Sequence, residues 1–235
     1  MELKGKVAVI TGAGRGVGRS IALALASEGV QLALVARTES ELKAVQQEVS
    51  ALGVPSLVLP ADISQTHQVE SMATQTLQTF GTVDILINNA GWCTPLRPVL
   101  ETTVEDWDRV MAVNARGTFL VTKAFLPALL AKGSGHIVNI STVVAKKGVA
   151  QVCAYCASKA AQVAFGESLL AEVGPLGIRV TNLLASPINT RMRWEATPDY
   201  PRERVLEPED VAQVVLDVLK APSHVLLDEV AVRKL

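Results

Sequence analysis

The chain has 235 residues, of which 49% are hydrophobic and 19% are charged, a composition that excludes long disordered stretches and allows one large buried core. Its 22 basic and 23 acidic side chains leave a formal net charge of −1, so no general field attracts nucleic acid or an anionic membrane. We therefore expect a small molecule or another protein as the partner.

The segment MELKGKVAVITG at the start of the chain has only a short apolar run and does not resemble a signal peptide. No apolar segment approaches the roughly 18 residues that a bilayer span requires. Three cysteines without an even framework favour a reducing compartment. We expect a cytoplasmic protein.

Short β-branched runs alternate with longer helical patterns along the chain. Segment 6–12 is almost continuously apolar, which predicts a strand buried on both faces. The helical pattern after it stops at Gly29, a residue typical of the position that follows a helix. Segment 31–37 predicts a second buried strand, and the next helix begins with Thr38 and Glu41 at the spacing of a capping box.

The alternation continues through the remaining sequence. We predict further strands at 56–62, 83–91, 135–141, 178–184 and 228–234, and the longest helices at about 103–132 and 153–174. Strand and helix in turn imply parallel pairing with right-handed crossovers, so we predict an α/β fold with a doubly wound parallel sheet covered on both faces. No repeat or linker interrupts residues 1–235, which we predict to form one domain. The one long irregular stretch is 186–207, rich in proline and charge.

A glycine-rich turn, TGAGRGVG at 11–18, follows the first strand and opens the first helix. That is where a phosphate cradle belongs, because glycine allows close backbone approach and the helix N-terminus offers unpaired N–H groups to a pyrophosphate. The spacing is T-G-x-x-x-G-x-G rather than G-x-G-x-x-G. A packing turn also uses glycines, and the strand–turn–helix context favours a nucleotide site over that alternative.

The end of the second strand indicates which nucleotide is bound. Dinucleotide folds that prefer NAD place an Asp or Glu there to hold the ribose 2′-hydroxyl, whereas this strand ends in Ala36 and Arg37. Arg37 can pair with a 2′-phosphate, and Arg15 in the glycine turn can reach the same group. The alternative for Arg37 is an exposed charge at a strand end. The sequence predicts NADP as the cofactor.

The segment CAYCASK, 153–159, has two interpretations. Tyr155 and Lys159 share one face of a helix, and the ammonium lowers the pKa of the phenol from its usual value of about 10. The phenol can then exchange a proton with a carbonyl or alcohol oxygen. Cys153 and Cys156 form a C-x-x-C typical of redox or metal sites. Because Cys156 lies about 100° round the helix from Tyr155, and no other Cys or His stands at ligand spacing, we predict no metal and read the cysteines as small buried hydrophobes.

Five motifs follow one another in order: TGAGRGVG, NNAG at 88–91, Asn114 in VNARG, NIST at the end of a strand, and YCASK. With them the chain resembles the short-chain dehydrogenases/reductases of the T-G-x-x-x-G-x-G group, from Lys6 to about Asn182. The resemblance implies a Rossmann fold with a seven-stranded parallel sheet and a nicotinamide site over the fourth and fifth strands. It also implies a homodimer or homotetramer, paired through the two longest helices.

The resemblance also implies residue roles. Asp62 contacts the adenine, Lys159 holds the nicotinamide ribose, and Asn114 holds a water that links Lys159 to solvent. Ile188 and Thr190 hold the carboxamide. The implied cofactor-binding residues are Gly12, Gly14, Arg15, Gly16, Val17, Gly18, Arg37, Asp62, Ile63, Asn89, Ala90, Gly91, Tyr155, Lys159, Ile188 and Thr190.

Two places depart from the family pattern. The position of the family's catalytic serine holds Thr142, with Ser141 just before it. A strand alternates its faces, so both hydroxyls cannot point at the substrate; we favour Thr142 and keep Ser141 as the alternative. After the sixth strand the segment 182–190, NLLASPINT, is shorter than the family pattern and lacks its glycine. The following stretch, 186–207, is expected to form the substrate flap.

The first functional hypothesis is an NADPH-dependent reductase of ketones or aldehydes. Tyr155 protonates the carbonyl oxygen, Thr142 stabilises it by a hydrogen bond, and Lys159 and Asn114 serve the proton relay. A 3-oxoacyl thioester is one candidate substrate. The second hypothesis, which the Thr142 exchange and the shortened loop keep open, is a non-catalytic NADP-binding sensor.

Overall fold

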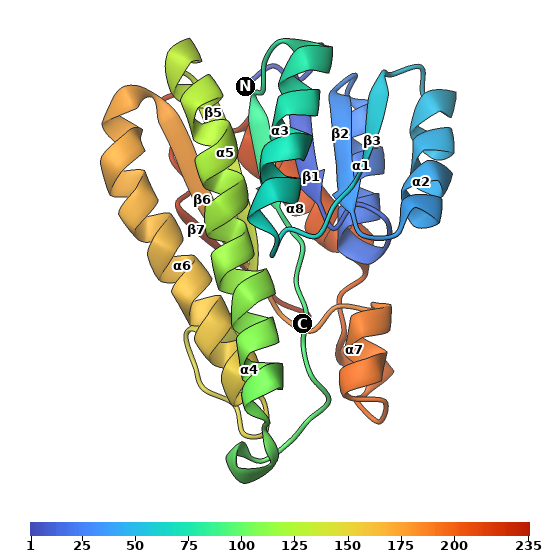
Figure 1. Cartoon of the computed structure of the whole chain (residues 1–235), viewed down its shortest axis with the longest axis vertical. Helices are drawn as coiled ribbons and strands as arrows, with labels where there is room; N and C mark the ends of the chain where they lie inside the picture. Colours follow the sequence, from blue (N-terminus) through green and yellow to red (C-terminus); the bar gives the residue numbers. More distant parts are fainter.

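The computed structural model describes residues 1–235 and contains one seven-stranded sheet. Its strands lie in the order β3-β2-β1-β4-β5-β6-β7, and every neighbouring pair is parallel. The strands are β1 (Val7–Thr11), β2 (Gln31–Ala36), β3 (Ser56–Pro60), β4 (Ile85–Asn88), β5 (Gly135–Thr142), β6 (Ile178–Ala185) and β7 (Glu229–Val232). The predicted doubly wound sheet is confirmed (Figure 1).

Helices cover both faces of this sheet (Figure 1). They are α1 (Gly16–Ser27), α2 (Glu39–Ala51), α3 (Thr66–Phe80), α4 (Val104–Met111), α5 (Gly117–Lys132), α6 (Cys153–Val173), α7 (Arg191–Ala196) and α8 (Pro208–Lys220). None of them combines the length and the apolar character that crossing a membrane requires. One apolar core joins α1, α2 and α8 to the sheet, and a second joins α3, α5 and α6 to its other face. Ala8 and Ile10 belong to the first core and Val7 and Val9 to the second, which is why β1 reads as a continuous apolar run.

The long helix predicted at 103–132 is interrupted. α4 is followed by a π-helical turn at Ala112–Arg116, and α5 begins directly after it. A π-turn adds a residue to the helix and so changes which side chains face inward. Here the turn carries Asn114, which is completely buried.

The predicted capping box at the start of α2 is wrong. Thr38 occupies the N-cap position, but its side chain makes no cap hydrogen bond. Glu41 instead pairs with Arg15 of the glycine turn, with Nη1 and Oε1 3.0 Å apart. A guanidinium is a stronger partner for a carboxylate than a backbone amide is, so the contact between distant segments replaces the local one.

The strand predicted at 83–91 is shorter in the structure, because Asn89 turns out of the sheet after β4 ends. Its amide Nδ2 donates to the carbonyl oxygens of Thr11 at 2.9 Å and Gly12 at 3.2 Å. The hydroxyl of Thr11 accepts the backbone N–H groups of Asn89 and Ala90 at 3.0 and 3.1 Å. These bonds lock the end of β4 to the glycine turn.

A row of hydrogen-bonded asparagines connects the sheet to α6. Asn88 Nδ2 donates to Asn139 Oδ1 at 2.9 Å, and Asn139 Nδ2 donates to Asn182 Oδ1 at 3.0 Å. Asn182 Nδ2 then donates to the carbonyl oxygen of Val163 in α6 at 3.2 Å. Gly166 lies directly over this row, and a Cβ there would collide with Asn182 Oδ1. The amides therefore need a glycine above them.

We expect Gly166→Ala to lower the free energy of unfolding by about 1–3 kcal/mol, because the added methyl overpacks the contact between α6 and the asparagines. Urea denaturation measures the change. Gly148→Ala is the matched control: no atom lies within 4 Å of a Cβ placed there, and its φ is not in the left-handed region. Equal effects of the two substitutions would contradict the close contact at Gly166.

Candidate active site

A cavity of about 710 Å³ opens over the carboxyl ends of the strands. It lies where the strand order reverses between β1 and β4, the usual place for ligands in doubly wound sheets. The predicted site residues that line it are Gly12, Gly14, Arg15, Gly16, Val17, Arg37, Asp62, Ile63, Asn89, Ala90, Gly91, Ser141, Thr142, Tyr155, Lys159, Ile188 and Thr190. The two predicted site residues that do not line it are Gly18 and Asn114.

The glycine turn has the form of an anion cradle. Gly12 has a φ of +67°, and a Cβ there would come within 2.8 Å of Asn89 Nδ2 and 2.9 Å of Ala90 Cα. A Cβ on Gly18 would collide with the carbonyl oxygen of Gly12. The N-terminus of α1 has no side-chain cap and no acidic residue in its first turn. Its free N–H groups and positive dipole end therefore suit a pyrophosphate.

Two arginines beside the turn differ in their charge balance. Arg15 is engaged in the ion pair with Glu41, which neutralises part of its charge. Arg37 follows β2, lines the same end of the cavity and has no ion-pair partner. Asp62, also at this end, accepts hydrogen bonds from the backbone and hydroxyl of Ser64 at 2.9 and 2.7 Å. Arg37 is thus the uncompensated cation at the glycine-turn end.

The other end of the cavity is lined by Tyr155 and Lys159 of α6. Lys159 is only 4% exposed, and its ammonium donates to the carbonyl oxygen of Ile140 and to Gln162 Oε1, both at 2.9 Å. Burial lowers the pKa of Lys159 to about 8. Burial also raises the pKa of Tyr155 above its usual value, while the Arg193 guanidinium lowers it in part.

The expected lowering of the Tyr155 pKa by Lys159 is therefore not seen. The ammonium is directed to Ile140 and Gln162, and burial of the phenol is the larger influence on its pKa. Tyr155 is half-buried, and the loss of hydration around its phenol disfavours ionisation, so Tyr155 carries its proton at neutral pH.

Gln162 is a site residue that the sequence analysis missed. It is completely buried one turn after Lys159, and its Nε2 donates to Thr118 Oγ1 at 3.0 Å. Thr118 Oγ1 in turn donates to the carbonyl oxygen of Asn114 at 2.8 Å. The available signal was a glutamine on the inward face of a predicted helix, three positions after the lysine.

Asn114 joins the loop after β4 to α6. Its Oδ1 accepts the N–H of Trp92 at 2.7 Å, and its Nδ2 donates to the Trp92 carbonyl and to Ser158 Oγ, both at 2.9 Å. These contacts hold the loop that borders Lys159. The water predicted between Asn114 and Lys159 stays a prediction.

The two candidate hydroxyls lie at the end of β5. Ser141 Oγ is buried and has no hydrogen-bond partner, whereas Thr142 is half-buried at the last position of the strand. Both residues line the cavity, and the choice between them stays a prediction.

The glycine-less segment after β6 has a defined path. The N–H of Ser186 donates to the Val232 carbonyl, and the N–H of Leu206 to the Pro187 carbonyl, both at 2.8 Å. Thr190 caps α7 by accepting the N–H of Arg193 at 3.3 Å. The Thr190 methyl lies 3.3 Å from where a Gly16 Cβ would stand, so this segment reaches the glycine turn.

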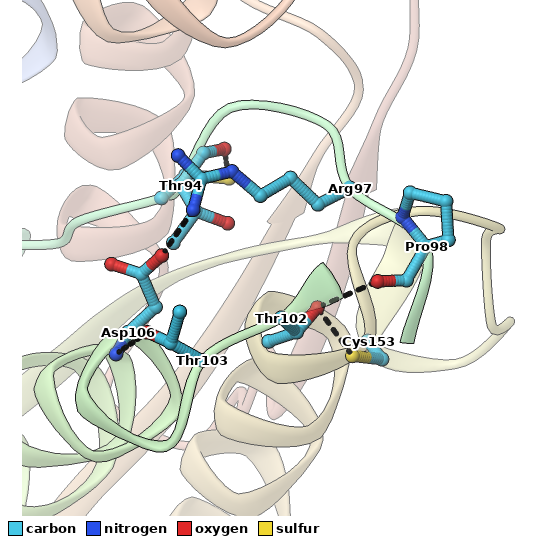
Figure 2. Close-up of polar contacts among 8 residues, drawn as sticks. Thr94, Arg97, Pro98, Thr102, Thr103, Asp106 and Cys153 are labelled. Carbon is cyan, nitrogen blue, oxygen red and sulfur yellow. Dashed lines mark hydrogen bonds and ion pairs between the residues drawn. The ribbon is translucent and has the colours of Figure 1, made fainter. Parts of the chain in front are cut away.

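The three cysteines are free. Cys93 lines the cavity, and burial raises the pKa of its thiol to about 11. Figure 2 shows Cys153 at the start of α6, with its Sγ 3.7 Å from Thr102 Oγ1, which donates to the Pro98 carbonyl at 3.1 Å. Nearby, Arg97 pairs with Asp106 at 2.9 Å (Figure 2). Cys153 therefore packs against the loop before α4, and no group of three or more His, Cys, Asp or Glu side chains gathers to hold a metal.

The geometry of this site agrees with the known proteins that the chain resembles. A family model described as short chain dehydrogenase matches residues 6–201. An uncharacterized oxidoreductase of Staphylococcus saprophyticus is 35% identical over 237 residues, covering 99% of each chain.

Two solved structures illustrate the likeness. An alcohol dehydrogenase from the archaeon Thermococcus sibiricus, complexed with 5-hydroxy-NADP, superposes with a TM-score of 0.91 at 31% identity, over 98% of this chain and 97% of its own. A 3-ketoacyl-(acyl-carrier-protein) reductase from Brucella melitensis, complexed with NADH, gives 0.90 at 29% identity, over 99% and 98%. The chain therefore belongs to the short-chain dehydrogenase family of oxidoreductases.

Proposed function

We propose that this protein is an NADPH-dependent reductase of ketones or aldehydes. The observation that carries the proposal is a single cavity with the glycine turn and Arg37 at one end and Tyr155 and Lys159 at the other. NADP carries its 2′-phosphate in the adenosine half and its reactive ring at the other end, with the pyrophosphate between them, so this arrangement suits both the cofactor and the chemistry.

The residues present fit a nicotinamide dinucleotide. The glycine turn and the N-terminus of α1 would hold the pyrophosphate, and Arg37 would hold a 2′-phosphate. Asp62 and Ile63 would border the adenine. The loop Asn89, Ala90 and Gly91, together with Ile188 and Thr190, would line the nicotinamide half. The cofactor, when bound, supplies the hydride that reduces the carbonyl carbon.

The chain's own residues manage the proton. Tyr155, which is protonated at neutral pH because loss of hydration raises its pKa, donates its proton to the carbonyl oxygen. Thr142, or Ser141 as the alternative, holds that oxygen by a hydrogen bond. Lys159, one helical turn after Tyr155 and lining the same cavity, serves the proton relay together with Asn114. Its orientation depends on Gln162 and the Ile140 carbonyl.

A 3-oxoacyl thioester is one candidate substrate, because the Brucella melitensis relative is a reductase of such a substrate by name. The second function, a non-catalytic NADP-binding sensor, is favoured by Thr142 in place of the family's serine.

We further propose one domain over 1–235, with 186–207 as the substrate flap and the cytoplasm as the location, in keeping with three free cysteines. A homodimer or homotetramer is proposed through α5 and α6. Phe119 of α5 is 44% exposed and packs edge-on against Phe165 of α6, so these two helices present apolar surface together.

We expect Tyr155→Phe to lower kcat by at least about 100-fold while leaving NADPH affinity unchanged, because only the proton donor is removed. NADPH consumption with a panel of ketones and aldehydes measures the first effect, and fluorescence titration with NADPH measures the second. Retention of most activity would show that another group is the acid.

In the same assay we expect Thr142→Ala to lower kcat more than Ser141→Ala does. The reverse order would move the oxygen-binding role to Ser141. Tight NADPH binding without turnover of any panel member supports the sensor.

We expect Arg37→Gln to weaken NADPH binding by about tenfold or more and to leave NADH binding unchanged, because a charge-assisted contact to the 2′-phosphate is lost. Arg15→Gln is the comparison variant and should have a smaller effect, since Glu41 already neutralises part of its charge. The dissociation constants of both variants for NADPH and NADH measure these effects. A protein that binds NADH as tightly as NADPH before any substitution would overturn the cofactor assignment.

We expect opposite pH shifts from two substitutions of Gln162. The Lys159 pKa is about 8, so an activity that needs the ammonium falls as the pH rises through that value. Gln162→Glu puts a carboxylate beside the ammonium and should move this fall upward by about one pH unit or more. Gln162→Leu removes an acceptor and should move it downward. Profiles of kcat against pH measure both, and a loss of activity without opposite shifts would reduce Gln162 to a packing role.

A further inference from the structure

Arg193 is a cation without a counter-charge inside the cavity. It lies in α7, lines the cavity and is half-buried. Its guanidinium packs over the ring of Tyr200, 3.9 Å from the centroid. Its Nε is buried and has no hydrogen-bond partner, and none of the ion pairs in the protein includes Arg193.

The other charged groups at the cavity are accounted for. Arg15 pairs with Glu41 at 3.0 Å, and Arg191 pairs with Glu195 at 2.6 Å. Lys159 has two acceptors of its own. Arg37 lies at the glycine-turn end, where the cofactor phosphate is proposed. Arg193 is thus the cation at the cavity with neither a counter-charge nor an assigned ligand.

No carboxylate pairs with Arg193, because Glu195, the acid nearest to it in the sequence, is paired with Arg191. Arg193 lines the cavity together with Tyr155 and Cys93, and its charge lowers the pKa of both groups in part. Cys93 is a neutral thiol, since burial raises its pKa to about 11. Apolar side chains that also line the cavity are those of Leu96, Val144, Val149, Val152 and Met192.

A half-buried guanidinium with free donors in an apolar wall is costly unless an anion compensates it. Its planar fork matches a carboxylate, which it can bind through two parallel hydrogen bonds. A neutral ketone or a thioester would cover Arg193 and leave it uncompensated. The favoured occupant of this position is therefore an anionic group on the substrate.

We propose that Arg193 binds a carboxylate of the substrate, and that the substrate is an oxo acid whose ketone or aldehyde carbon lies at Tyr155. The inference rests on the proposed reductase function and narrows its substrate class. The carbonyl is reduced by two electrons: its carbon receives a hydride from NADPH, which becomes NADP⁺, and its oxygen receives the Tyr155 proton. The carboxylate is unchanged, and the product is the corresponding hydroxy acid.

The test compares oxo acids of increasing chain length with their methyl esters, which keep the carbonyl and remove the charge. For at least one acid, kcat/KM should exceed that of its ester by about tenfold or more, the size of one charge-assisted contact. Arg193→Gln should remove this preference mainly by raising KM for the acid, with little change for the ester. Arg193→Lys should restore part of it.

Arg202→Gln is the matched control. Arg202 lies in the same flap and also packs over an aromatic ring, Trp194, at 4.4 Å, but it is exposed and does not line the cavity. This substitution should leave the preference for the acid intact. If it abolishes the preference as Arg193→Gln does, the effect belongs to flap stability and the proposal is wrong. The proposal is also overturned if esters or 3-oxoacyl thioesters have a higher kcat/KM than every acid and Arg193→Gln leaves their rates unchanged.

Calorimetric titration of the protein–NADPH complex with the acid and its ester separates this inference from the proposed function. Binding of the acid that is weakened by Arg193→Gln supports the carboxylate site even where no reduction occurs, and only the reductase function then fails. Reduction of neutral carbonyls combined with equal binding of acid and ester by both variants supports the function and refutes the role of Arg193.

Discussion

The seating of α6 on the sheet is the contact on which the candidate site depends. Tyr155, Lys159 and Gln162 all belong to this helix, so their positions follow from how closely it approaches β5 and β6. The approach is set by Asn182, which bonds to a carbonyl of the helix, and by Gly166, which leaves room for the amide. Buried amides are stabilising only when their donors and acceptors are paired, so the helix cannot shift without leaving polar groups unsatisfied.

A second polar layer surrounds the lysine. A buried ammonium is unfavourable, and the protein offsets this with the Ile140 carbonyl and Gln162 rather than with a carboxylate. These neutral acceptors orient the ammonium and leave its charge uncancelled. The same network continues through Thr118 to the backbone of Asn114 and so reaches the π-turn between α4 and α5.

Charge is distributed unevenly along the cavity. Where a cation has an acidic neighbour, as Arg15 has in Glu41, it serves the packing of the turn against α2. Where it has none, as with Arg37 and Arg193, it retains its attraction for an anion from outside the protein. Both arginines line the cavity, and they would suit the phosphate of the proposed cofactor and the carboxylate of the proposed substrate. The segment 186–207, which carries Arg193, is held by backbone hydrogen bonds at Ser186 and Leu206.

The sequence by itself determined the strand and helix pattern, the glycine turn and the pairing of Tyr155 with Lys159 on one helix, because apolar periodicity and short spacings are local properties of a chain. Tertiary structure decided the partners of the polar groups. Glu41 pairs with Arg15, 26 residues away, and does not cap α2 as expected. Gln162 donates to Thr118, 44 residues away. The direction of the Tyr155 pKa shift also depended on burial, which only the assembled cavity creates. The partner of a polar or charged side chain depends on which distant segments the fold brings together, and a local sequence pattern does not contain that information.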